Sequence, residues 1–151
     1  MIEEDYTLYK KKFSLPEFNK LDEEFDLQQA DSDYILKNIR KQMQDKIEFL
    51  SDIFADVLQP SPESFPQMHE CGQITEEEKV IVFQIYKKLQ YFLRMSHEAN
   101  LINTDEVNAE FIKEFSKGFV EIKQKSVPVL SSLKQAWKKA VQTDEVIGYF
   151  G

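Results

Sequence analysis

Apolar residues recur at intervals of three and four along most of this chain, which is the periodicity of helices that bury one face. The longest such run predicts a helix over 32–58, about 40 Å long at 1.5 Å per residue. Asp31 or Ser32 is its predicted N-cap, because a short polar side chain can accept the first free amides of a helix. Seven apolar side chains form its predicted buried stripe: Leu36, Ile39, Met43, Ile47, Leu50, Phe54 and Val57.

A shorter predicted helix precedes this one. Ser14 is its predicted N-cap, and Pro16 fits the first turn, where a missing N–H loses no helical partner. We expect residues 1–13 to form an N-terminal arm that can be mobile. The apolar positions of the short helix also follow helical spacing: Leu15, Phe18, Leu21 and Phe25.

Prolines and capping residues divide the middle of the chain. Three prolines predict a loop over 60–73, because proline cannot continue a helix. Thr75 and Glu78 then have the spacing of a capping box, in which each side chain accepts the other residue's backbone N–H. They predict a helix over about 75–100. The three prolines of the loop are Pro60, Pro62 and Pro66.

Two more helices are predicted after residue 100. Asn103, with Glu106 three residues later, is the predicted start of a helix over 104–126. Pro128 is predicted to end or kink this helix, because its ring crowds the preceding turn. The apolar spacing then resumes and predicts a fifth helix over 129–142.

Composition supports an all-α fold. The 151 residues include only four glycines and five prolines, too few for the turns of a sandwich or barrel. We therefore expect residues 1–151 to form one domain, an antiparallel bundle of four to five helices with a C-terminal tail over 143–151. Aromatic residues make up 13% of the chain, so rings should dominate the core. The predicted core residues are Ile39, Ile47, Leu50, Phe54, Leu89, Phe92, Phe111, Phe115, Phe119, Leu133 and Trp137.

Net charge and cysteine content restrict the partners and the compartment. The formal charge is −8 and no third of the chain is basic, which argues against direct binding to nucleic acid. A lone Cys71 suits a reducing compartment. The first residues lack the pattern of a signal peptide, and no apolar stretch approaches 18 residues. We therefore expect a cytoplasmic protein without a membrane segment.

An acidic row on the predicted 32–58 helix is the strongest candidate for metal chemistry. All-α nucleotide pyrophosphohydrolases hold magnesium with carboxylates on bundle helices. At 100° per residue, however, this row faces away from the apolar stripe, whereas such sites are built inside a bundle. The sequence therefore predicts a solvated, metal-free row, and it disfavours a small all-α metal-dependent hydrolase. The row consists of Asp45, Glu48, Asp52 and Asp56.

Other chemistry-bearing patterns are weak or absent. His69 and His97 both lack a glutamate three residues earlier, so the Glu-x-x-His pairs of di-metal bundles are missing. His69-Glu70-Cys71 brings reactive side chains together, but loop neighbours rarely form a catalytic pair, and we predict polar surface. Four glycines leave no phosphate-binding loop. The sequence thus predicts no catalytic residue, metal or cofactor and favours a non-enzymatic protein.

The helix predicted over 75–100 has two interpretations. Val80, Phe83, Tyr91 and Met95 fall outside its apolar arc, among lysines and an arginine. Either this helix is central and buried on several sides, or these side chains form a surface that binds a partner.

The last nine residues contain four large apolar side chains. They can fold back on the bundle or dock on another protein, because a short aromatic segment at a chain end suits peptide recognition. Two residues of the candidate partner surface on the 75–100 helix and three residues of this tail are the predicted partner-binding residues. They are Phe83, Tyr91, Val146, Tyr149 and Phe150.

Three resemblances to known protein families bear on the function. The 143–151 segment resembles the sliding-clamp-binding peptides of replication proteins, with Val146 as the aliphatic residue and Tyr149-Phe150 as the aromatic pair, but with Thr143 where those peptides carry Gln. The predicted order of a short helix, a long helix, a loop and a helix that starts at Thr75-Glu76-Glu77-Glu78 is similar to that of the helical domain of GINS replication factors. The 112–139 region and one shorter segment resemble uncharacterised all-helical archaeal proteins; that segment is Phe13-Ser14-Leu15-Pro16-Glu17-Phe18.

These observations predict two alternative functions, both of which depend on binding another protein. The first is a protein that acts through protein–protein interaction or self-association. The alternative is a replication-associated adaptor that binds a sliding clamp through its C-terminal tail, as the first resemblance implies. The metal-dependent hydrolase is the hypothesis from another class.

Overall fold

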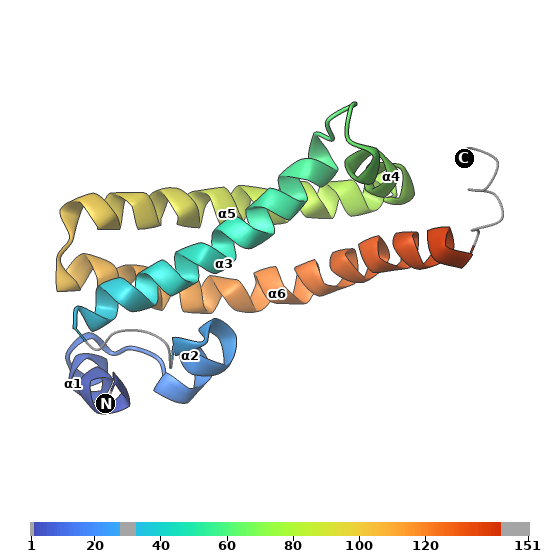
Figure 1. The fold of residues 1–151 in the computed structure, drawn as a ribbon. Coiled ribbons are helices and arrows are strands. Elements are labelled where there is room, and N and C mark those ends of the chain that lie inside the picture. The colour runs from blue at the N-terminus through green and yellow to red at the C-terminus, as the bar shows by residue number, and fades with distance from the viewer. Residues whose placement is uncertain (1, 28–32, 143–151) are drawn as a thin grey trace. The chain divides into compact units, whose positions relative to one another are not determined.

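The computed structural model describes residues 2–27 and 33–142, and over these residues the fold is all-α, as predicted. None of the helices in this part is both long and apolar enough to cross a membrane. Six helices follow one another along the described chain (Figure 1): α1 (Ile2–Phe13), α2 (Phe18–Phe25), α3 (Ile35–Leu58), α4 (Phe65–Gln73), α5 (Glu76–Ile102) and α6 (Asp105–Gln142).

The helices contribute to two compact units. Unit 1 comprises residues 1–51 and 88–121, and unit 2 comprises residues 52–87 and 122–151. Helices α3, α5 and α6 each supply one part to each unit. The prediction of a single domain remains a prediction.

A cluster of phenylalanine rings forms the centre of unit 1. Phe115 is fully buried, and its ring contacts four others at centroid distances of 5.1–5.7 Å. Rings at these separations and angles attract one another in addition to burying apolar surface. The cluster joins α2, α5 and α6, and its other members are Phe25, Phe92, Phe111 and Phe119.

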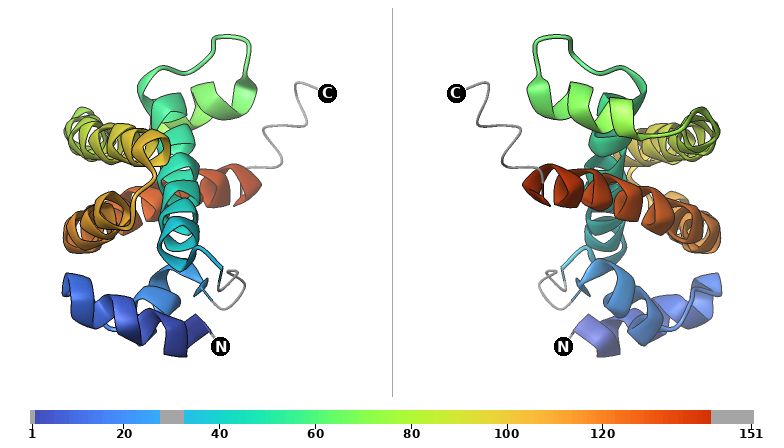
Figure 2. Two further views of the ribbon diagram at one scale, coloured as in Figure 1. Left: turned by 90° about the vertical axis from the view of Figure 1, so that its left-hand side faces the viewer. Right: turned by 90° about the vertical axis from the view of Figure 1, so that its right-hand side faces the viewer.

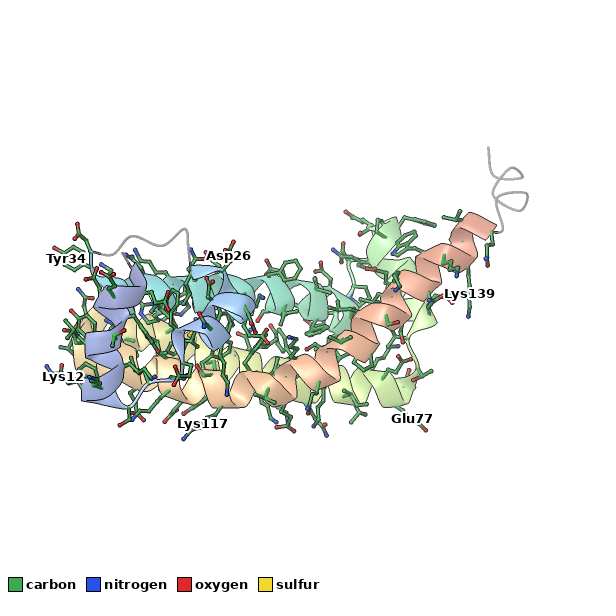
Figure 3. The ribbon with its side chains drawn as sticks, turned by 90° about the horizontal axis from the view of Figure 1, so that it is seen from below. Lys12, Asp26, Tyr34, Glu77, Lys117 and Lys139 are labelled. Carbon is green, nitrogen blue, oxygen red and sulfur yellow. The ribbon has the colours of Figure 1, made fainter. Side chains whose placement is uncertain are left out.

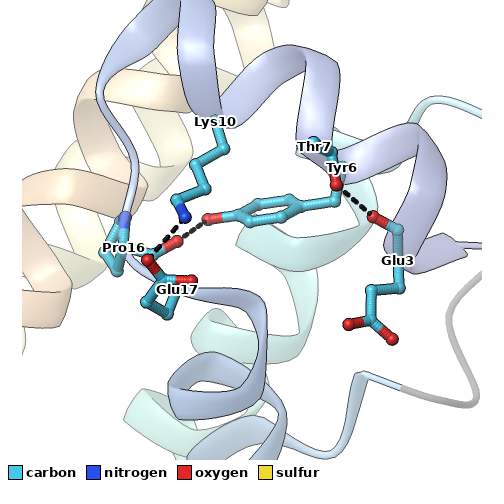
Figure 4. A network of polar contacts seen from close by, with 6 residues as sticks. All are labelled: Glu3, Tyr6, Thr7, Lys10, Pro16 and Glu17. Atoms are coloured by element: carbon cyan, nitrogen blue, oxygen red, sulfur yellow. Dashed lines mark hydrogen bonds and ion pairs between the residues drawn. The ribbon is translucent and has the colours of Figure 1, made fainter.

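The segment predicted as an arm is helix α1, which lies beside α2 (Figure 2). Tyr6 is buried, and its hydroxyl donates to the carbonyl oxygen of Pro16 at 2.5 Å (Figure 4). Lys10 forms an ion pair with Glu17. Burial, and secondarily the charge of Glu17, raises the pKa of the Tyr6 phenol, which therefore remains a donor. Sequence reasoning missed α1 because, among residues 3–13, Tyr6 alone has a fully buried side chain.

Ser14 does not cap a helix, contrary to the prediction. Its φ of 55° places it in the left-handed region just after α1, and the Leu15 N–H donates back to the Lys10 carbonyl. Helix α2 begins later, with Glu17 as an N-cap that makes no side-chain capping bond. Ser14 therefore ends one helix rather than starting the next.

The predicted caps of the long helix, Asp31 and Ser32, lie outside the described residues. Helix α3 begins at Ile35, three residues later than predicted, and the Asn38 N–H donates to the carbonyl of Tyr34. The Tyr34 side chain projects away from this first turn (Figure 3).

Asn103, predicted to cap the start of a helix, lies instead in the turn that ends α5. Asn103 has a φ of 52° and its N–H donates to the Ala99 carbonyl, so it terminates α5. Asparagine tolerates this left-handed conformation better than most residues. Thr104 caps α6 instead, since its hydroxyl accepts the Val107 N–H at 3.3 Å. The predicted helix start was therefore one residue too early.

In unit 2, the loop predicted over 60–73 contains helix α4. Ser64 is its N-cap and accepts the N–H of Gln67. Pro66 occupies the first turn, where its missing N–H has no intrahelical partner. The proline that appeared to forbid a helix therefore lies at a position where helices accept it.

The predicted capping box at the start of α5 is confirmed. The Glu78 N–H donates to the Thr75 hydroxyl and the Thr75 N–H donates to the Glu78 carboxylate, both at 3.1 Å. Ser132 of α6 donates to the same carboxylate at 2.6 Å. Hydrogen bonds from Ser132 and Thr75 lower the pKa of the Glu78 carboxyl, because they stabilise its charged form.

Helix α6 continues through Pro128, so the prediction of two separate helices is wrong. A proline inside a helix removes one hydrogen bond, here to the carbonyl of Gln124. Both Pro128 and Gln124 are exposed, so water can satisfy that carbonyl. Packing on either side then keeps the helix continuous, with Ile122, Val129 and Leu133 all buried.

The predicted core is confirmed at ten of its eleven positions. All seven stripe residues of α3 are buried as well. The exception is Trp137, which is only partly buried. Its indole N–H needs a polar partner, which the carboxylate of Glu70 provides.

Candidate functional site

Helix α4 presents an apolar surface to solvent. It has no fully buried residue, and its side chains Phe65 and Met68 are 75% and 47% exposed. They lie three residues apart and therefore on one face of the helix. Together with His69 and the partly buried Trp137 of α6, they form what we call the α4 surface.

Ring contacts and two hydrogen bonds hold this surface together. The His69 ring lies 4.5 Å from that of Trp137, and Phe65 lies 6.0 Å from His69 and 6.5 Å from Trp137. The Trp137 Nε1–H donates to Glu70 at 2.9 Å. His69 Nε2 lies 3.2 Å from the Ala136 carbonyl, which only accepts, so this bond places the proton on Nε2. Helix α4 is thus anchored on the last part of α6.

The sequence His69-Glu70-Cys71 was predicted to be polar surface, but all three residues are partly buried. The imidazole bonds the Ala136 carbonyl and the carboxylate bonds Trp137. Two of the three groups therefore serve the attachment of α4, whereas nucleophilic catalysis requires the imidazole beside the thiol.

The polar face of α5 distinguishes the two interpretations of that helix. Val80, Phe83 and Tyr91 are 58%, 51% and 60% exposed. Burial of this helix on several sides is therefore wrong at these positions, although Met95 is partly buried. The ammonium of Lys87 lies 5.1 Å from the centre of the Phe83 ring. Phe83 belongs to unit 2 and Tyr91 to unit 1, and their role in binding stays a prediction.

The other predicted partner-binding residues, Val146, Tyr149 and Phe150, lie outside the described residues. So does Thr143 of the clamp-binding resemblance.

The acidic row of α3 is exposed at each of its four positions, which confirms its predicted orientation. Carboxylates on a solvated face cannot converge in the way that an interior bundle site requires. Over residues 2–27 and 33–142, no cluster of three histidine, cysteine or acidic side chains has the arrangement of a metal site.

Sequence reasoning missed a buried arginine in unit 1. Arg40 is 1% exposed, and its guanidinium donates to Asn108 at 2.8 Å, to the Ser96 hydroxyl at 2.9 Å and to Asn100 at 3.1 Å. These acceptors are neutral, and burial lowers the pKa of the guanidinium. The feature of the sequence that could have predicted its burial is its position beside the apolar stripe, four residues after Leu36.

This network connects three helices and borders an open cavity. Arg40 lies on α3, and its acceptors lie on α5 and α6, so the bonds align those helices within unit 1. Asn108 also lines a cavity of about 700 Å³. The cavity mixes one base with two acids and has neither histidine nor cysteine in its lining, which consists of Tyr9, Asp33, Tyr34, Lys37, Asn103, Asp105 and Asn108.

Comparisons with known proteins leave the chain without an assigned family. No protein-family model matches it, and neither a curated protein nor a solved structure does. The resemblances given by its sequence remain predictions.

Proposed function

We propose that this chain is a non-enzymatic helical protein that binds another protein through the α4 surface. The observation that carries the proposal is contiguity. Single exposed apolar side chains are common on protein surfaces, whereas neighbouring ones mark interaction sites. Phe65 and Met68 are neighbours on one face, and the partly buried ring of Trp137 extends that face.

The chemistry of the surface suits an apolar protein segment. Aromatic residues and methionine are enriched in the centres of protein interfaces, and methionine adapts its shape to different partners. The Phe65 ring stacks on His69 on one side. A partner can therefore cover the other side of the ring without moving it. The expected partner therefore presents aliphatic or aromatic side chains to this face.

The two exposed aromatic residues of α5 are further candidates for contact with a protein partner. Phe83 and Tyr91 remain proposed contact positions, each on its own unit. A sliding clamp remains an alternative partner for residues 143–151, and that form of the proposal depends on Val146, Tyr149 and Phe150.

Paired variants test the proposed function. Phe65→Ser/Met68→Ser removes the apolar side chains of the α4 surface, and the control Leu8→Ser/Leu101→Ser removes two apolar side chains on other helices that are 73% and 86% exposed. We expect the wild-type protein and the control to capture the same stoichiometric partner from source cells, and the α4 variant to lose it. Circular dichroism should show equal helix content in all three proteins.

Quantitative binding to that purified partner completes the test. The α4 variant should bind at least about tenfold more weakly, the effect of about 1.4 kcal/mol of lost apolar contact. Equal affinity of the α4 variant and the control would contradict the proposed function. Sedimentation at several concentrations identifies self-association, in which case the partner is a second copy.

A further inference from the structure

The α4 surface lies next to the end of α6. Trp137 is in the second-last turn of that helix, which ends at Gln142, about 8 Å further along the axis at 1.5 Å per residue. The Phe65 ring is 6.5 Å from the Trp137 ring. Gln142, the residue to which the 143–151 segment is attached, therefore lies close to the exposed rings of α4.

Residues 143–151 have the composition expected of a ligand for this surface. The segment contains four large apolar side chains, two of them aromatic: Val146, Ile147, Tyr149 and Phe150. Aromatic rings pack favourably on other rings in tilted or offset arrangements. Phe65, His69 and Trp137 already adopt such arrangements with one another, and Phe65 has an open face.

The covalent connection makes even weak binding effective. Nine extended residues span at most about 30 Å, which exceeds the distance that separates the end of α6 from the rings of α4. A short flexible link gives a local concentration on the order of millimolar. A segment whose free peptide binds with a dissociation constant of about 1 mM would thus be about half bound when attached.

We propose that residues 143–151 bind the α4 surface of the same molecule and compete there with a protein partner. This inference rests on the proposed function, because it names a resident occupant and a means of regulation for the same surface. A partner must then displace the segment, and a protein without the segment binds that partner more tightly.

Trp137 supplies the signal that tests the proposal. It is the only tryptophan of the chain, and it forms part of the α4 surface. Deletion of residues 143–151 should shift its emission to longer wavelength. Deletion should also raise its quenching by acrylamide about twofold, since the open edge of the indole returns to water.

Two full-length variants separate apolar contact from other effects of deletion. Tyr149→Ser/Phe150→Ser should reproduce the spectrum and quenching of the deleted protein. The matched control, Asp144→Asn/Glu145→Gln, changes the same segment without touching its apolar side chains and should behave as wild type. A synthetic peptide of residues 143–151, added to the deleted protein, should restore the wild-type signal saturably, and the peptide with both serines should not.

Three outcomes decide the matter. The proposal holds if the signal of the full chain is independent of protein concentration and is lost with the aromatic pair. It is overturned if full-length and deleted proteins have equal quenching, or if the difference grows with concentration, which would place the segment on a second copy. Equal quenching, with capture still abolished by Phe65→Ser/Met68→Ser, would overturn this inference and leave the proposed function standing.

Discussion

At the scale of single residues, the structure contains two kinds of buried side chain with different demands. Phe115 needs only close packing, which four neighbouring rings provide. Arg40 needs an acceptor for each of its nitrogens, because an unpaired buried donor costs about 1–3 kcal/mol. Asn108, Ser96 and Asn100 meet that need from two other helices. Packing stabilises unit 1, whereas the arginine network defines which helices can be neighbours.

The first prediction concerns Phe115. Its replacement by alanine should lower the free energy of unfolding by about 3–5 kcal/mol, through lost transfer energy and the cavity left among four rings. Urea unfolding followed by circular dichroism measures this change. A loss below about 1 kcal/mol would mean that the surrounding rings collapse into the space, contrary to the usual cost of such cavities.

At the scale of helices, local signals were reliable where the sequence presents a complete hydrogen-bonding motif. Thr75 and Glu78 supply both halves of a capping box, and the structure forms it. Ser14 and Asn103 were each assigned to the start of the following helix, yet both adopt a left-handed conformation at the end of the preceding one. A polar residue between two helices can serve either, and the chain geometry of the turn decides which.

The second prediction uses Gly72 of α4 and Gly118 of α6, both of which lie inside a helix. A Cβ at Gly118 would lie 2.7 Å from the Phe92 ring, which is itself packed on Phe115, whereas a Cβ at Gly72 meets nothing within 4 Å. Alanine favours a helix over glycine by up to about 1 kcal/mol at either site. Gly72→Ala should therefore stabilise the protein, and Gly118→Ala should destabilise it by about 1 kcal/mol through overpacking.

Thermal unfolding of the two glycine variants, side by side, measures the difference. The propensity gain is common to both, so the gap between their midpoints isolates the contact with Phe92. Equal midpoints would show that the Phe92 ring moves aside without cost.

The third prediction concerns pH. The pKa of Glu78 is lowered in the folded protein, so its contribution is present above the ordinary glutamate pKa of about 4.3 and is lost as pH falls through the folded pKa. Glu78→Gln should be less stable than wild type by about 0.5 kcal/mol at pH 7, because the glutamine oxygen can still accept these hydrogen bonds but carries no charge to favour the start of the helix. The two proteins should converge in stability only as the pH falls below the folded pKa of Glu78. A gap that persists unchanged at low pH would assign the effect to packing instead.

At the scale of the whole molecule, continuity of the long helices is the main feature. Helices α3, α5 and α6 contribute to both compact units, so neither unit consists of a separate stretch of chain. Unfolding one unit would leave three helix ends of the other without their continuation. Helix formation is cooperative, so such interruptions weaken what remains.

The fourth prediction follows from this continuity. Urea unfolding followed by circular dichroism reports all helices, and Trp137 fluorescence reports unit 2 alone. The two transitions should coincide, which is the test for a single cooperative domain. A fluorescence transition at lower urea than the circular dichroism transition would instead show that unit 2 unfolds independently.

The sequence by itself determined the helical class, most of the core and the orientation of the acidic row. Periodicity encodes these features, because every residue of a helix turns by the same angle and the apolar face must be buried. The seven stripe residues of α3 and the exposed row on its other face follow from that single rule.

Only the tertiary structure decided which marginal segments form helices and which apolar side chains remain exposed. Helix α4 depends on contacts of His69 and Glu70 with α6, which lie 67 residues away in sequence. Helix α6 continues through Pro128 because packing on both sides outweighs one lost hydrogen bond. Burial of Arg40 and exposure of Phe65 likewise depend on how many neighbours each helix acquires, and local periodicity carries no information about that number.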